Sequence, residues 1–279
     1  MRNDVTLLID FQNALYKYLS INYGLEHNNI RTGGIYGFVT HFSHLINVHK
    51  PTKVIVCNDY PPYKRSVTCA EYKGDRQKLE DDLFDYIQNS KKFCYKFLEY
   101  LGIPLWFEKG FECDDLFGAY CKKFDSESII LSSNDNDLNQ LLNAKISIYK
   151  QNKQYTIDNF RQEFNIEPDD WIKVLAMSGT HNNLKNLYKG LGIKTAIKIL
   201  KDKVKMDNML FSYKEQYENN LKLIKLPYDD TITIPDFGKI AIIDSEREAI
   251  NYLMREFGIR ITSQMNESFA ILRSTINLI

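Results

Sequence analysis

The sequence lacks the features that mark several common classes of protein. It contains no run of about 18 apolar residues, so no membrane-spanning helix is predicted. Its first residues, MRNDVTLLID, include an early acid and no signal-peptide cleavage site, and we therefore expect a cytoplasmic protein. The five cysteines are odd in number and never spaced C-x-x-C, which argues against a disulfide framework or a zinc knuckle. Reduced, mostly buried thiols are expected instead.

The chain also lacks net charge, because 36 basic residues balance 36 acidic ones. The two signs are nevertheless unevenly distributed. Seven lysines and a single acid, Asp202, lie between Lys185 and Lys205, whereas acids gather in short clusters elsewhere. A chain divided in this way can bind phosphate at one place and cations at another.

Short apolar segments rich in β-branched residues predict five strands, with helical periodicity between them. The strands are expected at residues 5–10, 53–58, 103–108, 128–133 and 145–150. Strand–helix alternation is typical of an α/β fold, here a mainly parallel twisted sheet with helices on both faces. After about residue 157 the segments predict helices. We therefore expect an α/β core at residues 1–160 packed against a helical region at 161–279.

Acidic residues follow each of the first four predicted strands. Asp10 ends the first strand, Asp59 follows the second, E-C-D-D follows the third and N-D-N-D the fourth. The acids of the last two stretches are Glu112, Asp114, Asp115, Asp135 and Asp137. Any one of the seven is more simply explained as a helix cap or a loop residue. Together they should converge, because sites in parallel α/β sheets form at the carboxyl ends of the strands.

Converging carboxylates repel one another unless they share protons or bind cations. A set of oxygen ligands selects a hard ion, Mg²⁺ or Mn²⁺, rather than zinc. Phosphoryl transfer is the chemistry that suits such a site, because the metal activates water and neutralises charge on the phosphate.

Two basic segments could hold a polyanionic substrate. A-E-Y-K-G-D-R places Lys73 and Arg76 beyond the second strand. G-L-G-I-K-T-A-I-K predicts a glycine turn before a helix, where backbone N–H groups bind phosphate. The candidate residues of this turn are Gly190, Gly192, Lys194, Thr195 and Lys198. The alternative interpretation of the turn is a simple corner between two helices.

Taken in order, these residues resemble the 5′-nuclease family: flap endonucleases, the 5′-nuclease domain of bacterial DNA polymerase I, and phage 5′–3′ exonucleases and RNase H of the T5 and T4 types. The matching stretches are LLIDFQNALY, VCND, EYKGDR, ECDDLFGA, SSNDNDLNQL and GTHNNLKNLYKGLGIKTA. The resemblance implies a PIN-like fold and a metal-dependent, structure-specific 5′-nuclease that acts in DNA replication or repair.

The resemblance also implies ligands for two ions of Mg²⁺, for which Mn²⁺ can substitute. The ligands of the first ion would be Asp10, Asp59, Glu112 and Asp114. Asp135 and Asp137 would serve the second ion, and Asp115 would support the cluster directly or through water.

For the substrate, the resemblance implies contacts from several segments. Lys73 and Arg76 would contact the scissile phosphate, and residues from about 61 to 89 would form an arch over the single-stranded 5′ end. Tyr16 would stack on the terminal nucleotide, with a core aromatic as the alternative. A helix–three-turn–helix at about 170–203 would grip duplex DNA and hold a K⁺ at its glycine turn. The expected partners of this monomer are 5′-flap, nicked or gapped DNA and RNA·DNA hybrids.

One motif departs from the family pattern. The family has G-D-x-x-D-N before its glycine turn, whereas this chain has G-T-H-N-N-L at residues 179–184. Thr180 and Asn183 therefore replace two acids of the second metal site. Each offers an oxygen but no charge, and hard-ion sites are tuned by ligand charge. We expect the second ion to bind more weakly.

The sequence is compatible with three functions. One is a working 5′-nuclease that recruits its second ion weakly, or is slow, or needs Mn²⁺. Another is a protein that binds branched DNA without cutting it, which the two replaced acids favour. The third is a PIN-type ribonuclease, although that class lacks the helix–three-turn–helix.

Overall fold

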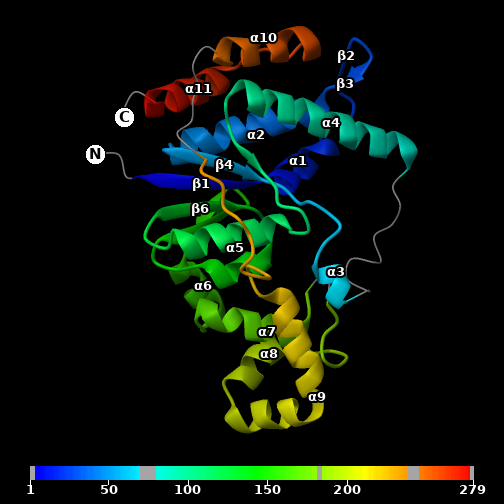
Figure 1. Cartoon of the computed structure of the whole chain (residues 1–279), viewed down its shortest axis with the longest axis vertical. Coiled ribbons are helices and arrows are strands. Elements are labelled where there is room, and N and C mark those ends of the chain that lie inside the picture. Colours follow the sequence, from blue (N-terminus) through cyan, green and yellow to red (C-terminus); the bar gives the residue numbers. More distant parts are fainter. Residues whose placement is uncertain (1–3, 70–79, 181–183, 238–244, 277–279) are drawn as a thin grey trace.

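A six-stranded sheet crosses the middle of the molecule (Figure 1), whose computed structural model describes residues 4–69, 80–180, 184–237 and 245–276. In spatial order the strands are β5 (Leu105–Trp106), β4 (Lys53–Cys57), β1 (Val5–Asp10), β6 (Ser128–Ser132), β7 (Ile146–Lys150) and β8 (Lys153–Tyr155). The first five are parallel, and β8 is antiparallel to β7. The predicted α/β class with a mainly parallel sheet is confirmed.

The edge strand β5 is shorter than the predicted strand at 103–108. Pro104 has no N–H to donate to a ladder, and only its carbonyl pairs with the sheet, accepting a hydrogen bond from Val56 N at 3.0 Å. Beyond Trp106 the chain turns at Gly110, whose φ of 90° favours glycine. The strand therefore has room for two residues only.

Three short strands lie outside the predicted set, and two-residue turns explain them. β8 folds back on β7 through Gln151 and Asn152, and β2 (Glu26–His27) pairs with β3 (Ile30–Arg31) through Asn28 and Asn29. These four turn residues all have positive φ. Asn adopts that conformation more readily than most residues, and hairpin turns of this kind require it.

One face of the sheet is covered by α1 (Phe11–Leu19), α2 (Gly33–His49) and α4 (Asp81–Tyr100) (Figure 1). Leu7 and Ile9 of β1 point into this layer, where both are almost completely buried. The helices α10 (Ser245–Phe257) and α11 (Ser263–Ile276) form a further layer over α4 and α2. The last part of the predicted helical region therefore packs with the α/β core, and how the chain divides into domains stays a prediction.

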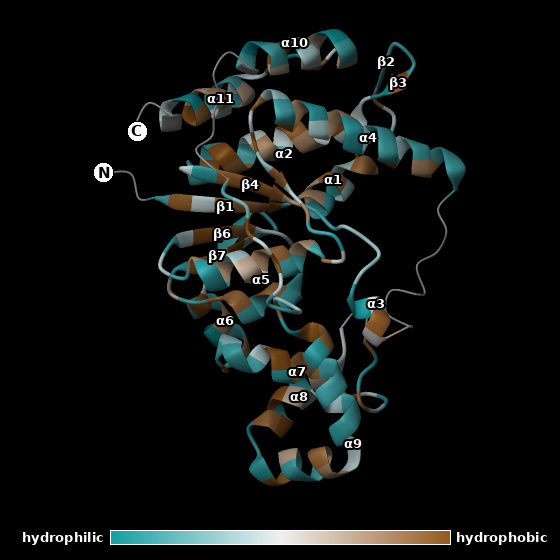
Figure 2. Cartoon of the chain, viewed as in Figure 1, coloured by the Kyte–Doolittle hydropathy of each residue, from teal (hydrophilic) through white to brown (hydrophobic). Residues whose placement is uncertain are grey.

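The opposite face of the sheet is covered by α5 (Cys113–Lys123), and the remaining helices follow beyond it. Leu8 of β1 points into this layer because side chains alternate along a strand. The elements beyond are η1 (Asn136–Leu141), α6 (Ile157–Phe164), η2 (Pro168–Asp170), α7 (Trp171–Ser178), α8 (Ile193–Leu200) and α9 (Lys203–Ile224). Figure 2 shows hydrophobic residues concentrated on the strands and on the inner sides of the flanking helices.

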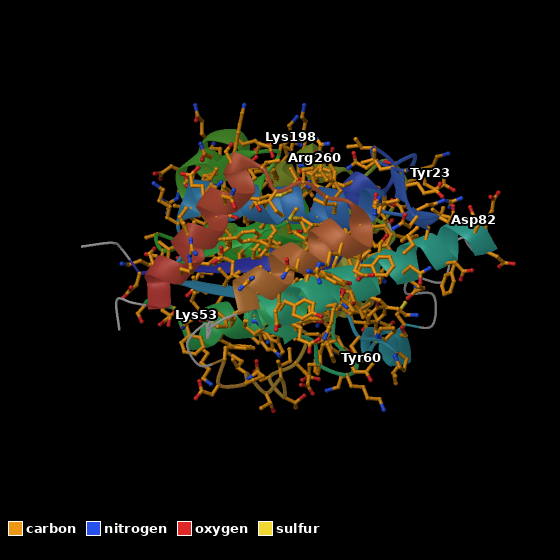
Figure 3. The ribbon with its side chains drawn as sticks, turned by 90° about the horizontal axis from the view of Figure 1, so that it is seen from above. Tyr23, Lys53, Tyr60, Asp82, Lys198 and Arg260 are labelled. Carbon is orange, nitrogen blue, oxygen red and sulfur yellow. The ribbon has the colours of Figure 1, made fainter. Side chains whose placement is uncertain are left out.

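The predicted arch at about 61–89 includes the short helix α3 (Arg65–Thr68) and the first turns of α4. The start of α4 is held beside the β2–β3 hairpin. Arg31 Nη1 and Tyr23 OH both donate to Asp82 Oδ2, at 2.8 and 3.0 Å, at one end of the molecule (Figure 3). Residues 70–79, between α3 and α4, lie outside the described residues.

Candidate active site

Asp10 and Asp59 lie at the carboxyl ends of the neighbouring strands β1 and β4. Asp10 caps α1, accepting from Asn13 N, and it also accepts from Ser133 Oγ, both at 2.9 Å. Asp59 accepts from Tyr63 OH at 3.0 Å and from Cys113 N at 2.9 Å. Both carboxylates are therefore held in fixed orientations by groups of adjacent elements.

The start of α5 brings Asp114 to Asp10. One carboxylate oxygen of each, together with Cys113 Sγ, lies within 4.8 Å of the other two atoms. We call Asp10, Cys113 and Asp114 the first group. Cys113 was not among the predicted site residues, although its place inside E-C-D-D was the signal that could have found it. The three atoms lie at separations that a single bound ion could bridge.

The two carboxylates of the first group have raised pKa values, because they are buried near other acids. Burial raises the pKa of Asp10 from 3.8 to about 7, and the charges of Asp59 and Asp135 add to the increase. Burial also raises the pKa of Asp114 well above its usual value, with the nearby charges of Asp135, Asp10 and other acids. Carboxylates in such a place take up protons unless a cation is present.

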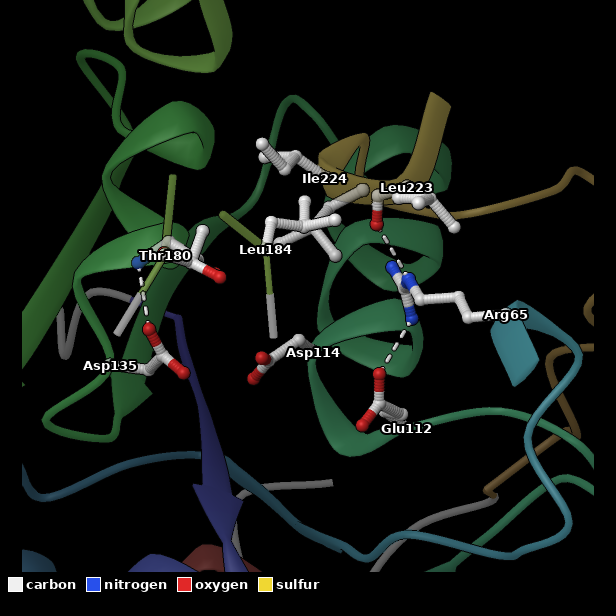
Figure 4. A pocket seen from close by; sticks show the side chains of 10 residues that line it. Arg65, Glu112, Asp114, Asp135, Thr180, Leu184, Leu223 and Ile224 are labelled. Atoms are coloured by element: carbon white, nitrogen blue, oxygen red, sulfur yellow. Dashed lines mark hydrogen bonds and ion pairs between the residues drawn. The ribbon is translucent and has the colours of Figure 1, made fainter. Parts of the chain in front are cut away.

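Asp135, Asp137 and Thr180 form a second group across a cavity of about 50 Å³ from Glu112 and Asp114 (Figure 4). Asp135 caps η1 by accepting from Asp137 N at 2.8 Å. Thr180 Oγ1 is buried and has no hydrogen-bond partner among the described residues. Asn183, the other replaced acid, lies outside the described residues. Thr180 therefore presents an oxygen at the cavity without a charge.

Asp115 contacts two residues that line this cavity, Arg65 and Glu112. Its carboxylate accepts from Arg65 on both oxygens, from Tyr228 N on Oδ1 at 2.8 Å and from Glu112 N on Oδ2 at 3.1 Å. Burial raises its pKa, and the guanidinium of Arg65 acts in the opposite direction. The described contacts of Asp115 are thus directed to Arg65 and the backbone.

Arg65 is a site residue that sequence reasoning missed. Its side chain is only 4% exposed and lines the cavity. Besides Asp115 it donates to Glu112 Oε2 at 3.0 Å and to the carbonyl of Leu223 at 2.7 Å (Figure 4). Nothing in the sequence distinguishes Arg65 from the adjacent Lys64, because the burial of Arg65 depends on α5 and α9, which are distant in the chain.

The structure leaves the phosphate-contacting pair untested, since Lys73 and Arg76 lie outside the described residues. Tyr16 is described: its side chain projects from α1 with 42% exposure, and Lys91 Nζ of α4 lies 5.8 Å from the ring centroid. Burial lowers the pKa of Lys91, although the charge of Asp59 opposes this. A ring with this exposure is not a core aromatic, and its stacking on a nucleotide stays a prediction.

The glycine turn lies between α7 and α8. Gly190 has a φ of 87°, and Gly192 is the N-cap of α8. Lys194, Thr195 and Lys198 are exposed on the first turns of that helix, while the buried Leu191 anchors the turn to the core (Figure 3 shows Lys198 at the outside of the molecule). The two helices and their connection fit the predicted location of a helix–three-turn–helix, whose identity stays a prediction, as does the K⁺.

Known proteins that are similar to this chain include 5′–3′ exonucleases. The family model described as 5′–3′ exonuclease, N-terminal resolvase-like domain, matches residues 5–165. The 5′–3′ exonuclease of Aquifex aeolicus is 30% identical over 221 residues, which cover 74% of this chain and 75% of that one. The 5′–3′ exonuclease of Buchnera aphidicola from Schizaphis graminum is 27% identical, covering 92% and 89% of the two chains.

Solved structures show the same fold at low identity. The D15 protein of T5, co-crystallized with metal ions, has a TM-score of 0.65 at 16% identity and covers 97% of this chain and 99% of its own. Flap endonuclease-1 from Methanococcus jannaschii has a TM-score of 0.62 at 19% identity, with 99% and 94% covered. The predicted PIN-like 5′-nuclease fold is confirmed.

The fold and the family match together define the class of protein: it is a nuclease, and therefore a hydrolase. More particularly, the chain belongs to the 5′–3′ exonuclease family. In the part of the chain that the structure describes, no helix has both the length and the apolar character that a membrane span requires.

Proposed function

We propose that the protein is a divalent-metal-dependent 5′-nuclease that hydrolyses phosphodiesters near the 5′ ends of branched or nicked DNA or of RNA·DNA hybrids. The observation that carries the proposal is a convergence of acids: Asp114 lies beside Asp10 and also lines one cavity with Glu112, Asp135 and Asp137. The charge of Asp59 acts on both Asp10 and Asp114. Acids packed this closely are unfavourable without a cation, which the raised pKa values of Asp10 and Asp114 reflect.

The residues present fit a hard divalent ion. Carboxylate oxygens dominate the donor set, and the buried Thr180 Oγ1 adds a neutral oxygen at the cavity wall. Asp10, Asp59, Glu112 and Asp114 would hold the first ion, and Asp135 and Asp137 the second. When bound, the ions would supply a water of lowered pKa and neutralise charge on the phosphate. Mg²⁺ is the proposed ion, with Mn²⁺ as a substitute.

The chain's own residues would orient the substrate. Lys73 and Arg76 would contact the scissile phosphate, and Tyr16 would stack on the terminal base. Backbone N–H groups at the start of α8, with Lys194 and Lys198, would hold a duplex phosphate at some distance from the acids. Such an arrangement would place cleavage near a duplex end by binding on both sides of the scissile bond.

The test is a time course with a 5′-flap DNA labelled at its 5′ end, in EDTA and across titrations of Mg²⁺ and Mn²⁺. We expect metal-dependent cleavage that disappears in Asp10→Ala and in Lys73→Ala. Arg161→Ala is the matched control, because Arg161 forms an exposed ion pair with Glu167 on the outside of α6. Cleavage that persists in EDTA or in Asp10→Ala would contradict the proposal.

Binding of branched DNA without cleavage is the second candidate, and the uncharged Thr180 at the second group favours it. It predicts salt-dependent flap binding without turnover at any metal concentration. The variant Thr180→Asp with Asn183→Asp separates the two candidates. Cleavage that appears only in this double variant would mean that the natural chain is a binding protein on a nuclease scaffold.

A further inference from the structure

Arg65 joins three segments that are far apart in the sequence. It lies in α3, and its guanidinium contacts Glu112 and Asp115 at the start of α5. Nε donates to the carbonyl of Leu223 at 2.7 Å, and Nη2 to the carbonyl of Lys225 at 3.3 Å. The fixed fork of an arginine can satisfy such a set of acceptors, whereas a lysine ammonium is a point charge.

The contact with Glu112 reaches the candidate metal site directly. Glu112 is only 6% exposed and lines the same cavity as Asp114 and Asp135. Arg65 Nη1 holds Glu112 Oε2 at 3.0 Å, so the guanidinium fixes the rotamer of this carboxylate. Groups that orient a metal ligand through a hydrogen bond affect metal affinity although they never touch the metal.

The contact with Leu223 links Arg65 to α9, and through it to the helices beside the glycine turn. Leu223 lies in the last turn of α9, where helix carbonyls have no partner inside the helix. α9 packs against α7 and α8, the helices that flank the glycine turn. The positive charge of Arg65 also suits the negative end of the helix. The same guanidinium therefore binds the metal-site helix and the end of the helical region.

We propose that Arg65 is a positioning residue: it fixes Glu112 for metal binding and keeps the metal site in register with the helices around the glycine turn. The inference rests on the proposed function, since it concerns the same site. The proposal predicts that loss of the fork geometry weakens the binding of the divalent ion more than it weakens the fold or the binding of DNA.

The primary variant is Arg65→Lys, which keeps the charge and removes the fork. We expect the Mg²⁺ dissociation constant, measured by titration calorimetry on folded protein, to rise by about 10- to 100-fold, the range seen when a ligand loses its orienting partner. Flap binding in EDTA should change little. Arg161→Lys is the matched control, since Arg161 also makes a forked contact with a glutamate, but on the exposed surface.

A double-mutant cycle tests whether Arg65 acts through Glu112. Arg65→Lys combined with Glu112→Gln should be non-additive in Mg²⁺ affinity, because the second change removes the group that the first one disorients. Combined with Asp10→Asn, whose carboxylate is held by Asn13 and Ser133 instead, the effects should add. Additive effects in both cycles would overturn the proposal.

Stability is measured beside affinity, because removing one partner of a buried ion pair is destabilising. If Arg65→Lys does not fold, Asp115→Asn gives the second variant: it loosens one side of the fork, and Mg²⁺ should again bind more weakly. Unchanged Mg²⁺ affinity in a folded variant would make Arg65 a structural residue only. If wild type binds Mg²⁺ but never cuts DNA, the proposed function fails, while the affinity cycle still decides the role of Arg65.

Discussion

The two groups of metal-site residues differ in how the protein holds them. Asp10 and Asp114 are set by the end of a central strand and the start of a buried helix, and an oxygen of each lies within 4.8 Å of Cys113 Sγ. Asp135 is exposed at the cap of a short 3-10 helix. The first group gathers charge in a rigid, partly buried place, whereas the second has lost charge at Thr180. Metal affinity should therefore depend mainly on the first group.

The largest expected effect tests this comparison by removing one acid from each group. Asp114→Asn should reduce the single-turnover cleavage rate by about 1000-fold, the upper range for losing one preorganised electrostatic group. Asp137→Asn, in the more open group, should cost less. Rates measured at saturating Mg²⁺ on the same flap substrate provide the comparison. Equal losses would mean that the two groups contribute alike.

Cys113 gives the first group a soft ligand that the second group lacks. Cd²⁺ prefers thiolate ligands, and we expect it to bind at the first group with an ultraviolet thiolate-to-cadmium absorption band. Cys113→Ala should abolish the band and weaken Cd²⁺ binding by about 100-fold, since even an outer partner of a ligand is worth 10- to 100-fold. Cys69→Ser, which alters the least buried thiol, is the control and should retain the band.

Adding charge to the second group should bring its contribution to metal binding closer to that of the first group. Thr180→Asp adds a carboxylate at the cavity, and the Mg²⁺ concentration at half-maximal cleavage should fall on the order of 10-fold, since ligand charge tunes hard-ion sites. Thr180→Asn, which stays neutral, is the matched control. A midpoint unmoved by the new carboxylate would show that the second group does not limit metal recruitment.

The smallest expected effect concerns stability and pH in EDTA. The pKa of Asp10 is about 7 in the folded protein and 3.8 in the unfolded chain, so the folded protein keeps this proton to a higher pH. Because the pKa is raised on folding, Asp10 stabilises the fold below about pH 4, and this contribution is lost as pH rises to about 7. As pH rises through this window, the free energy of unfolding of Asp10→Asn should therefore increase relative to that of wild type. The expected increase is on the order of 1–2 kcal/mol, because Asp10 is partly exposed.

Urea unfolding at several pH values gives the free energies that this comparison needs. Saturating Mg²⁺ should reverse the trend in wild type, because the ion binds the ionised carboxylate. Parallel stability curves for Asp10→Asn and wild type would show that the environment of Asp10 does not favour its protonated form.

Much of the sheet and the acid cluster could be predicted from the sequence for one physical reason. Parallel strands end at the same edge, so acids such as Asp10, Asp59 and Asp135 converge once the strand order is fixed. The capping interpretation also holds in part. Asp10 and Asp135 are both helix caps and members of the acid cluster, so the two interpretations did not exclude each other.

The rest depended on contacts that no local pattern encodes. Arg65 is buried only because α5 and the end of α9 meet around it, 47 and 158 residues away. Similarly, α10 was predicted as a helix, but its apolar face does not reveal that α4 is the surface it covers. The β2–β3 turn is different, because Asn28 and Asn29 are a local signal for a two-residue hairpin turn.

The outer layer of α10 and α11 has a practical consequence for dissecting the protein. The acids of the candidate site, Arg65 and the glycine turn all lie before residue 227, so a fragment ending near residue 240 would retain every proposed functional group. Yet Leu253, Met265, Phe269 and Leu272 are buried in the core of α2 and α4. The shortened chain would expose that core to water, and its inactivity would report aggregation rather than a missing catalytic group.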